Sequence, residues 1–141
     1  MNAFKIVVLL ATVVSCAAQQ PEEGKTMYLY VNGSRLEAEL AKTEAAAALA
    51  GRLLQGDVTY RAEDYGGFEK VGAPGFPLPA DDRQIRAQLG DIMLYQGSSI
   101  VIFYGGNSWS YTPLAKIRGK TAAQLKTLLG GGAQQITLSL K

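Results

Sequence analysis

The sequence predicts a mainly β domain: a closed, eight-stranded antiparallel β-barrel with two capping helices. Three observations lead to this fold class. Apolar and polar residues alternate in short runs, Gly-bearing turns separate consecutive runs, and only two segments show helical spacing. Eight short strands suit a closed barrel because the first and last strands pair and leave no exposed edge.

A hairpin with one buried face opens the predicted domain. Met27, Leu29 and Val31 alternate with residues suited to the other face, and a turn follows at residues 32–34. A second alternating run then continues to Leu40. These two runs supply the first two strands.

The first helix is predicted directly after this hairpin. Thr43 can cap its N-terminus, and the apolar spacing continues to about Gln55. The i, i+3, i+4, i+7 stripe consists of Ala46, Leu49, Ala50 and Leu53. We expect this helix to cover one end of the barrel.

Six further strands complete the expected set. They are predicted at residues 57–62, 68–71, 92–96, 100–104, 114–117 and 136–140. Pro74, Pro77 and Pro79 exclude a central strand from the long connection that contains them. Residues 105–113 are rich in Gly, Asn and Ser and are predicted as a loop.

The second helix is predicted before the last strand. Thr121 and Gln124 have the spacing of a capping box, and helical spacing continues to Leu129. Three glycines at residues 130–132 then end the helix. We expect it to cover the other end of the barrel.

Composition excludes several classes of function. The chain of 141 residues fits one domain, and removal of a leader with Lys5 leaves 13 basic against 12 acidic residues, too balanced for nucleic-acid binding. The absence of His removes His-based catalytic triads and the commonest metal ligand. The Gly-rich turns lack the spacing of nucleotide-binding loops. We therefore expect no metal and no cofactor.

The N-terminal segment predicts export. Residues 1–18 read as a signal segment, in which Lys5 precedes the apolar run 6–14 and Cys16 ends a lipobox-like sequence. We expect a lipoprotein of the bacterial cell envelope, which contacts the membrane through a lipid on Cys16 alone. The alternative is ordinary secretory cleavage, since Ser15 and Ala17 also satisfy the small-x-small rule. The protein would then be periplasmic or secreted.

The mature chain is divided into a tether and a domain. Residues 19–26 form a polar tether that bears Pro and Gly, and residues 27–141 form the barrel domain.

Two segments carry a resemblance to a known family. Residues 64–70, DYGGFEK, and residues 90–117, GDIMLYQGSSIVIFYGGNSWSYTPLAKI, resemble bacterial cyclophilin-like domains. These are small β-barrels related in fold to the peptidyl-prolyl isomerases. The resemblance covers residues 27–141 and implies the order hairpin, helix, strands, helix and final strand. Related domains occur beside flavodoxin-like proteins, so the resemblance also admits a redox protein as partner.

The resemblance implies two competing functions. Cyclophilins carry an Arg in a Phe-His-Arg strand motif, and Arg61 in Thr59-Tyr60-Arg61 stands at the corresponding place. The family's His and its Gln-Gly-Gly-Asp run are missing, and Glu69 puts an acid where an amide is wanted. We therefore expect a non-catalytic module that binds a small molecule or a peptide segment. The alternative is a peptidyl-prolyl isomerase with a degenerate active site, in which Arg61 would be catalytic.

The candidate site is a groove between residues 65–70 and residues 107–111. Its expected apolar walls are Tyr65, Phe68, Trp109 and Tyr111, and its expected polar anchors are Arg61 and Glu69. Ligand sites of this kind are apolar with a few convergent polar groups.

Simpler readings of these residues stay open. Arg61 can be a solvated strand residue paired with Glu63 or Asp64, and Glu69 can form an ordinary exposed pair with Lys70. Aromatic side chains can also cover the top of the barrel instead of binding a ligand.

Overall fold

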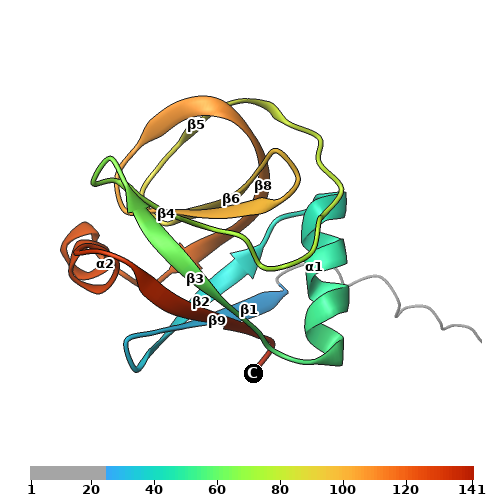
Figure 1. Cartoon of the computed structure of the whole chain (residues 1–141), viewed down its shortest axis with the longest axis horizontal. Helices are drawn as coiled ribbons and strands as arrows, with labels where there is room; N and C mark the ends of the chain where they lie inside the picture. Colours follow the sequence, from blue (N-terminus) through green and yellow to red (C-terminus); the bar gives the residue numbers. More distant parts are fainter. Residues whose placement is uncertain (1–24) are drawn as a thin grey trace, which may run out of the picture.

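The computed structural model describes residues 25–141 (Figure 1). The predicted signal segment, Cys16 and residues 19–24 of the tether lie outside the described residues. The described part contains two helices, neither of them long and apolar enough to span a bilayer.

The described residues form nine strands and two helices. In chain order these are β1 (Thr26–Val31), β2 (Ser34–Leu40), α1 (Glu44–Gln55), β3 (Val58–Tyr65), β4 (Glu69–Gly72), β5 (Arg83–Ala87), β6 (Asp91–Tyr95), β7 (Ser99–Phe103), β8 (Asn107–Arg118), α2 (Ala122–Leu129) and β9 (Gln134–Ser139). The order hairpin, helix, strands, helix and final strand is confirmed.

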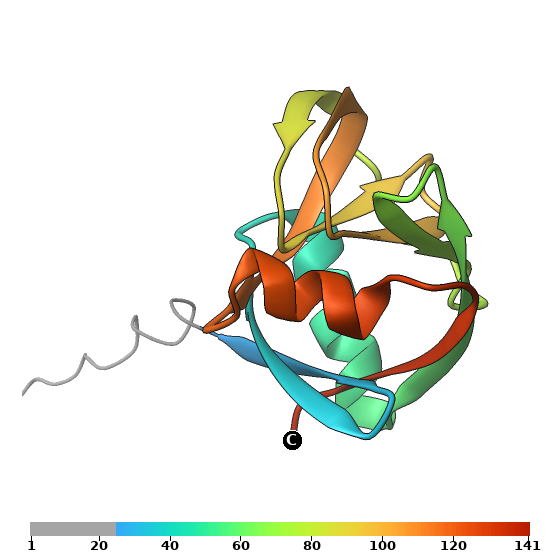
Figure 2. The same cartoon turned by 90° about the vertical axis from the view of Figure 1, so that its left-hand side faces the viewer.

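Eight of the strands form an antiparallel ring. Their order is β2-β1-β9-β3-β4-β7-β6-β8, and β8 pairs with β2 to close the ring. The closing contact spans the register from Glu37 opposite Arg118 to Leu40 opposite Ala115. Figure 2 looks into the ring from the side of α2.

The ninth strand, β5, corrects the prediction of eight strands. Residues 83–87, which the sequence left in a loop, pair with residues 107–111 of β8. The prediction of a loop at residues 105–113 was therefore wrong. Its polar, Gly-rich composition suggested a loop, but Trp109 and Tyr111 alternate with small serines as a strand requires. The β5–β8 ribbon projects from the ring (Figure 1).

The interior of the ring is the main core. It includes the fully buried Leu29, Ile100 and Ile102, together with α1 and α2 side chains. The buried helix residues are Ala45, Ala46, Leu49 and Leu53 in α1 and Leu125 and Leu129 in α2. The two helices lie at opposite openings of the ring (Figures 1 and 2).

Both helix starts follow the sequence prediction. Thr43 caps α1, accepting a hydrogen bond of 3.1 Å from the backbone N–H of Ala46. Thr121 and Gln124 form the predicted capping box of α2, with bonds of 3.1 Å and 2.8 Å. Each cap satisfies backbone donors that the first helical turn leaves unpaired.

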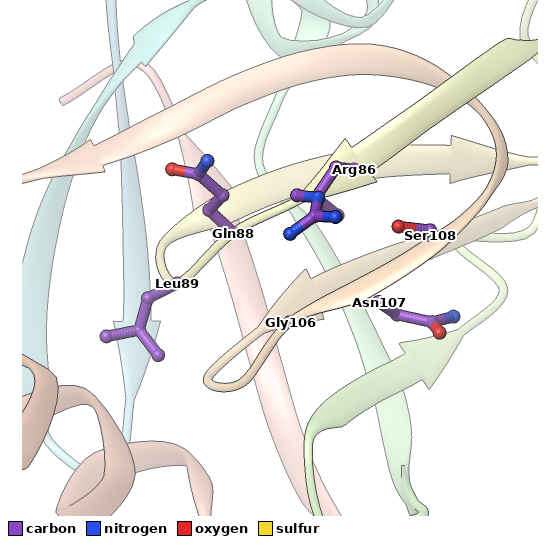
Figure 3. Close-up of a pocket in the computed structure, with 7 residues that line it drawn as sticks. Arg86, Gln88, Leu89, Gly106, Asn107 and Ser108 are labelled. Carbon is purple, nitrogen blue, oxygen red and sulfur yellow. The ribbon is translucent and has the colours of Figure 1, made fainter.

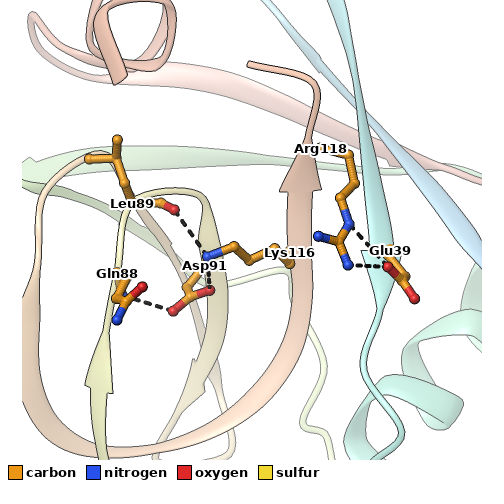
Figure 4. A network of polar contacts seen from close by, with 6 residues as sticks. All are labelled: Glu39, Gln88, Leu89, Asp91, Lys116 and Arg118. Carbon is orange, nitrogen blue, oxygen red and sulfur yellow. Dashed lines mark hydrogen bonds and ion pairs between the residues drawn. The ribbon is translucent and has the colours of Figure 1, made fainter. Parts of the chain in front are cut away.

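A polar network holds the start of β6 against β8 (Figure 4). Lys116 forms an ion pair of 3.1 Å with Asp91 and donates a hydrogen bond of 3.3 Å to the carbonyl of Leu89. Asp91 also accepts a bond of 2.8 Å from the backbone N–H of Gln88. This network fixes the chain where it leaves the β5–β8 ribbon and returns to the ring.

A second, smaller cluster lies on the outside of the ring. Its buried members are Ala87, Met93, Val101, Phe103 and Tyr111, with Phe68, Val71, Ile85 and Tyr95 packed against them. We call it the outer cluster. Strand alternation explains its position, because residues next to interior positions point to the opposite face. The β5–β8 ribbon covers it from the solvent side.

Thr43 should be the more costly of the two helix caps to remove. Its hydroxyl accepts from Ala46 and also donates a hydrogen bond of 2.8 Å to the carbonyl of Pro113 in β8. Thr43→Ala should therefore lower the free energy of unfolding by about 1–2 kcal/mol. Thr121→Ala, whose hydroxyl acts within its own helix, is the matched control and should cost less in the same urea titration. Equal losses would contradict the role of the bond to β8.

Candidate functional site

The β3–β4 hairpin positions the first side chains of the site. Gly66 takes a φ of 63°, and its lack of a side chain leaves room for the ring of Phe68. The carbonyl of Phe68 accepts hydrogen bonds of 2.9 Å and 3.0 Å from the backbone N–H groups of Tyr104 and Gly105. A Cβ on Gly105 would lie 2.7 Å from the Cβ of Phe68. The hairpin tip is thus fixed against the end of β7.

Glu69 lies in the middle of a row of aromatic residues. It pairs with Tyr65 of β3 on one side and with Phe103 of β7 on the other. Paired residues share one face of the sheet, so all three side chains point toward the outer cluster. The rings of Tyr65 and Phe68 meet edge to face at 6.0 Å.

Tyr111 packs over this row from the β5–β8 ribbon. Its ring lies 5.4 Å from the ring of Phe103 and 6.2 Å from the ring of Tyr95. Asn107 donates a hydrogen bond of 2.9 Å to the Tyr111 hydroxyl. Burial raises the pKa of Tyr111, Asn107 opposes that effect, and the nearby Glu69 carboxylate adds to it. The phenol therefore stays neutral beside Glu69.

In the part of the chain that the structure describes, no basic side chain pairs with the Glu69 carboxyl. Its side chain is buried at 7% exposure, and its Oε1 atom has no hydrogen-bond partner among the described residues. Burial raises the pKa of Glu69 to about 7. A buried acceptor without a partner costs about 1–3 kcal/mol, so the fold maintains this arrangement at an energetic cost.

The neighbouring basic side chains are engaged elsewhere. Arg61 forms an ion pair of 2.8 Å with Glu63, and Arg83, opposite Tyr111 in β5, forms one of 3.0 Å with Asp81. The prediction that Arg61 anchors the groove remains a proposal. Its structural alternative, a solvated strand residue paired with Glu63, is confirmed.

Lys70 points away from the site into the ring. It is fully buried, forms an ion pair of 3.5 Å with Asp64 and donates a hydrogen bond to the carbonyl of Gly132. Tyr104 donates to Asp64, and this bond, more than Lys70, lowers the pKa of Asp64. The reading of Glu69 and Lys70 as an exposed pair was therefore wrong, because consecutive strand residues face opposite sides.

The open side of the site is aromatic. Tyr65 is 63% exposed and Trp109 is 56% exposed, although large apolar side chains usually bury more of their surface. Trp109 stands two residues before Tyr111 in β8 and hence on the same face of that strand. We call Tyr65, Phe68, Glu69, Trp109 and Tyr111 the aromatic face.

The structure brings together most of the predicted site. Tyr65, Phe68, Glu69 and Tyr111 converge, but Tyr111 lies beneath the surface at 3% exposure instead of lining an open groove. Sequence reasoning missed Asn107, which orients Tyr111. The signal was its place four residues before Tyr111, on the same face of a strand that was not recognised.

One pocket lies next to the aromatic face, and another lies away from it. The first, of about 490 Å³, lies at the end of the β5–β8 ribbon (Figure 3) and is lined by Arg86, Ala87, Gln88, Leu89, Gly106, Asn107 and Ser108. Asn107, which donates a hydrogen bond to the Tyr111 hydroxyl, is also one of the residues that line this pocket. The second, of about 580 Å³, lies against α1, with Lys25, Lys42 and Leu54 among its lining residues. Within residues 25–141 no group of three acidic, Cys or His side chains is placed to hold a metal ion.

Glu69 should make the stability of the protein depend on pH. A carboxyl whose pKa rises from 4.5 to about 7 on folding contributes its full stability below about pH 4.5 and loses it as the pH rises through 7. Wild type should therefore lose about 1–3 kcal/mol of unfolding free energy between pH 4.5 and pH 8.

Glu69→Gln should abolish most of this loss, as measured by urea unfolding across that range. Glu63→Gln, which alters the exposed partner of Arg61, is the control and should retain it. A pH dependence unchanged in Glu69→Gln would show that the buried carboxyl is not its source.

Comparisons with known proteins agree with this architecture. Among curated proteins, none matches the chain. Of the solved structures, the solution structure of a hypothetical protein from Archaeoglobus fulgidus aligns with a TM-score of 0.64 at 12% identity, over 87% of this chain and 100% of that one. At this identity the likeness concerns the fold alone. The profile of the cyclophilin-like family matches residues 29–141, nearly all of the described chain, and the protein therefore belongs to the cyclophilin-like family.

Proposed function

We propose that this chain is a non-catalytic binding module, which takes a small molecule or a peptide segment on the aromatic face. The observation that carries the proposal is Glu69, a buried carboxyl whose Oε1 atom lacks a partner among the described residues and which lies beside the exposed Tyr65 across the β3–β4 pair. A protein core has no need of such a group. A ligand that binds beside this carboxyl and compensates its charge would recover part of the free energy that the free protein forgoes.

The exposed rings support the same proposal. Tyr65 and Trp109 offer apolar surface with polar edges, a combination that is enriched where proteins bind partners. The face is built on strands β3, β4 and β8, which hold the side chains in place before a ligand arrives. Little ordering would be needed on binding.

The isomerase alternative receives less support. Prolyl isomerisation on this pattern needs an Arg that reaches the twisted imide in an apolar pocket. Arg61 is instead paired with Glu63 at the surface, with 71% of its side chain exposed. A buried carboxyl would also oppose the negative end of the peptide carbonyl.

Binding on the aromatic face should depend on Trp109. For any peptide or metabolite that raises the melting temperature in a thermal-shift screen, Trp109→Ala should weaken binding by about 2 kcal/mol or more. The side chain is 56% exposed, so the melting temperature without ligand should change little. Leu54→Ala, which removes an exposed apolar side chain from α1, should leave the affinity unchanged. A large loss of stability with intact affinity would make Trp109 a structural residue.

We further propose that the protein is an envelope lipoprotein, anchored through Cys16, whose tether presents the binding domain to its surroundings. Cys16→Ala should move the protein from the membrane fraction to the soluble envelope or secreted fraction, as followed by fractionation and immunoblotting. Ser15→Ala, which keeps a small residue before the Cys, is the control and should stay in the membrane. Membrane partition of Cys16→Ala equal to that of wild type would refute the lipid anchor.

A further inference from the structure

The aromatic face combines one buried acid with several electron-rich rings. Tyr65 lies beside Glu69 across the β3–β4 pair, Phe68 packs edge to face on Tyr65, and Tyr111 lies close enough for the Glu69 charge to act on its hydroxyl. Aromatic rings carry negative potential on their faces and attract cations. The rings and the acid therefore favour the same kind of ligand.

The described residues supply no ion-pair partner to Glu69. Among the described residues, Arg61 and Arg83 are bound to Glu63 and Asp81, and Lys70 points to the other side of β4. Elsewhere the same fold does neutralise its acids: Arg118 binds Glu39 across the closing strands, as Figure 4 shows. Glu69 is thus a buried acid without a countercharge within residues 25–141.

We propose that the aromatic face is a receptor for an alkylammonium group, with Glu69 as its counter-ion and the exposed ring of Tyr65, its neighbour across the β3–β4 pair, as the nearest wall. This inference rests on the proposed binding function and names its ligand class. An ammonium group at the surface of this face would supply the countercharge that the almost buried Glu69 carboxylate lacks among the described residues.

Other ligand classes fit the same place less well. An anion would meet the Glu69 carboxylate, and the nearby Arg61 and Arg83 are already paired with acids. A neutral ligand would leave the ionised carboxylate without a countercharge. Only a cation gains from both the carboxylate and the ring faces.

The proposal predicts a release of protons on binding. The titratable groups that face Glu69 are Tyr65 of β3 and Tyr111 of β8, and Tyr95 of β6 lies against Tyr111. Burial raises the pKa of Tyr111, so its phenol stays neutral near pH 7. A bound cation favours ionised Glu69, so affinity should rise as the pH is raised from 5 to 8.

The test uses three tripeptides and one small amine on the isotope-labelled protein, followed by NMR titration. The peptides are acetyl-Ala-Lys-Ala-amide, its norleucine analogue, which lacks only the ammonium group, and its glutamate analogue. The amine is n-butylammonium. If the natural ligand is a lysine side chain, the Lys peptide should bind more tightly than n-butylammonium. If it is a free amine, n-butylammonium should bind as tightly as the Lys peptide or more tightly.

The expected result is a set of amide shifts in residues 65–69 and 107–111, with the Lys peptide or n-butylammonium bound at least about tenfold more tightly than the norleucine peptide. This advantage should disappear in Glu69→Gln, persist in the control Glu63→Gln, and grow about tenfold or more from pH 5 to pH 8 in wild type.

Two outcomes separate this inference from the proposed function. If the norleucine or glutamate peptide shifts the same residues with equal or higher affinity, the aromatic face binds ligands but is no ammonium receptor. If none of the four probes shifts residues of the face, while a ligand from the thermal-shift screen does, the cation inference alone fails. If nothing from either set binds there, both proposals fail.

Discussion

The pairing of β2 with β8 is the constraint on which the rest of the structure depends. It joins the two ends of an eight-stranded sheet, and so separates every strand into an inner and an outer face. The inner faces need two helices to seal them, and part of the outer face needs the β5–β8 ribbon. Without this closure, neither the sealed core nor the covered outer cluster would form.

Sequence patterns predicted the ring well because its strands obey simple rules. Alternation located β1 and β2, and the hydroxyls of Thr43 and Thr121 marked both helix starts. The β5–β8 ribbon escaped prediction because the Gly, Asn and Ser residues around Trp109 and Tyr111 suggested a loop, and because its stability comes from packing on a face that only ring closure creates. Local patterns do not contain that information.

The candidate site likewise has a part that local sequence could predict and a part that it could not. Tyr65, Phe68 and Glu69 could be predicted as a group because they are neighbours in one hairpin. The burial of Glu69 and Tyr111 could not, since it depends on strands far apart in the sequence. Glu69 and Lys70 illustrate the limit: the same two adjacent letters describe an exposed pair or, as here, two buried charges on opposite sides of a strand.

The position of β9 has a consequence for how the protein folds during its synthesis. This last strand lies between β1 and β3, so the first and third strands have no neighbour in common until residues 134–139 have been synthesised. A nascent chain therefore carries two unpaired strand edges until this segment has been made. Completion of the sheet depends on contacts between residues far apart in the sequence, which are slow to form and leave these edges open to other chains in the meantime.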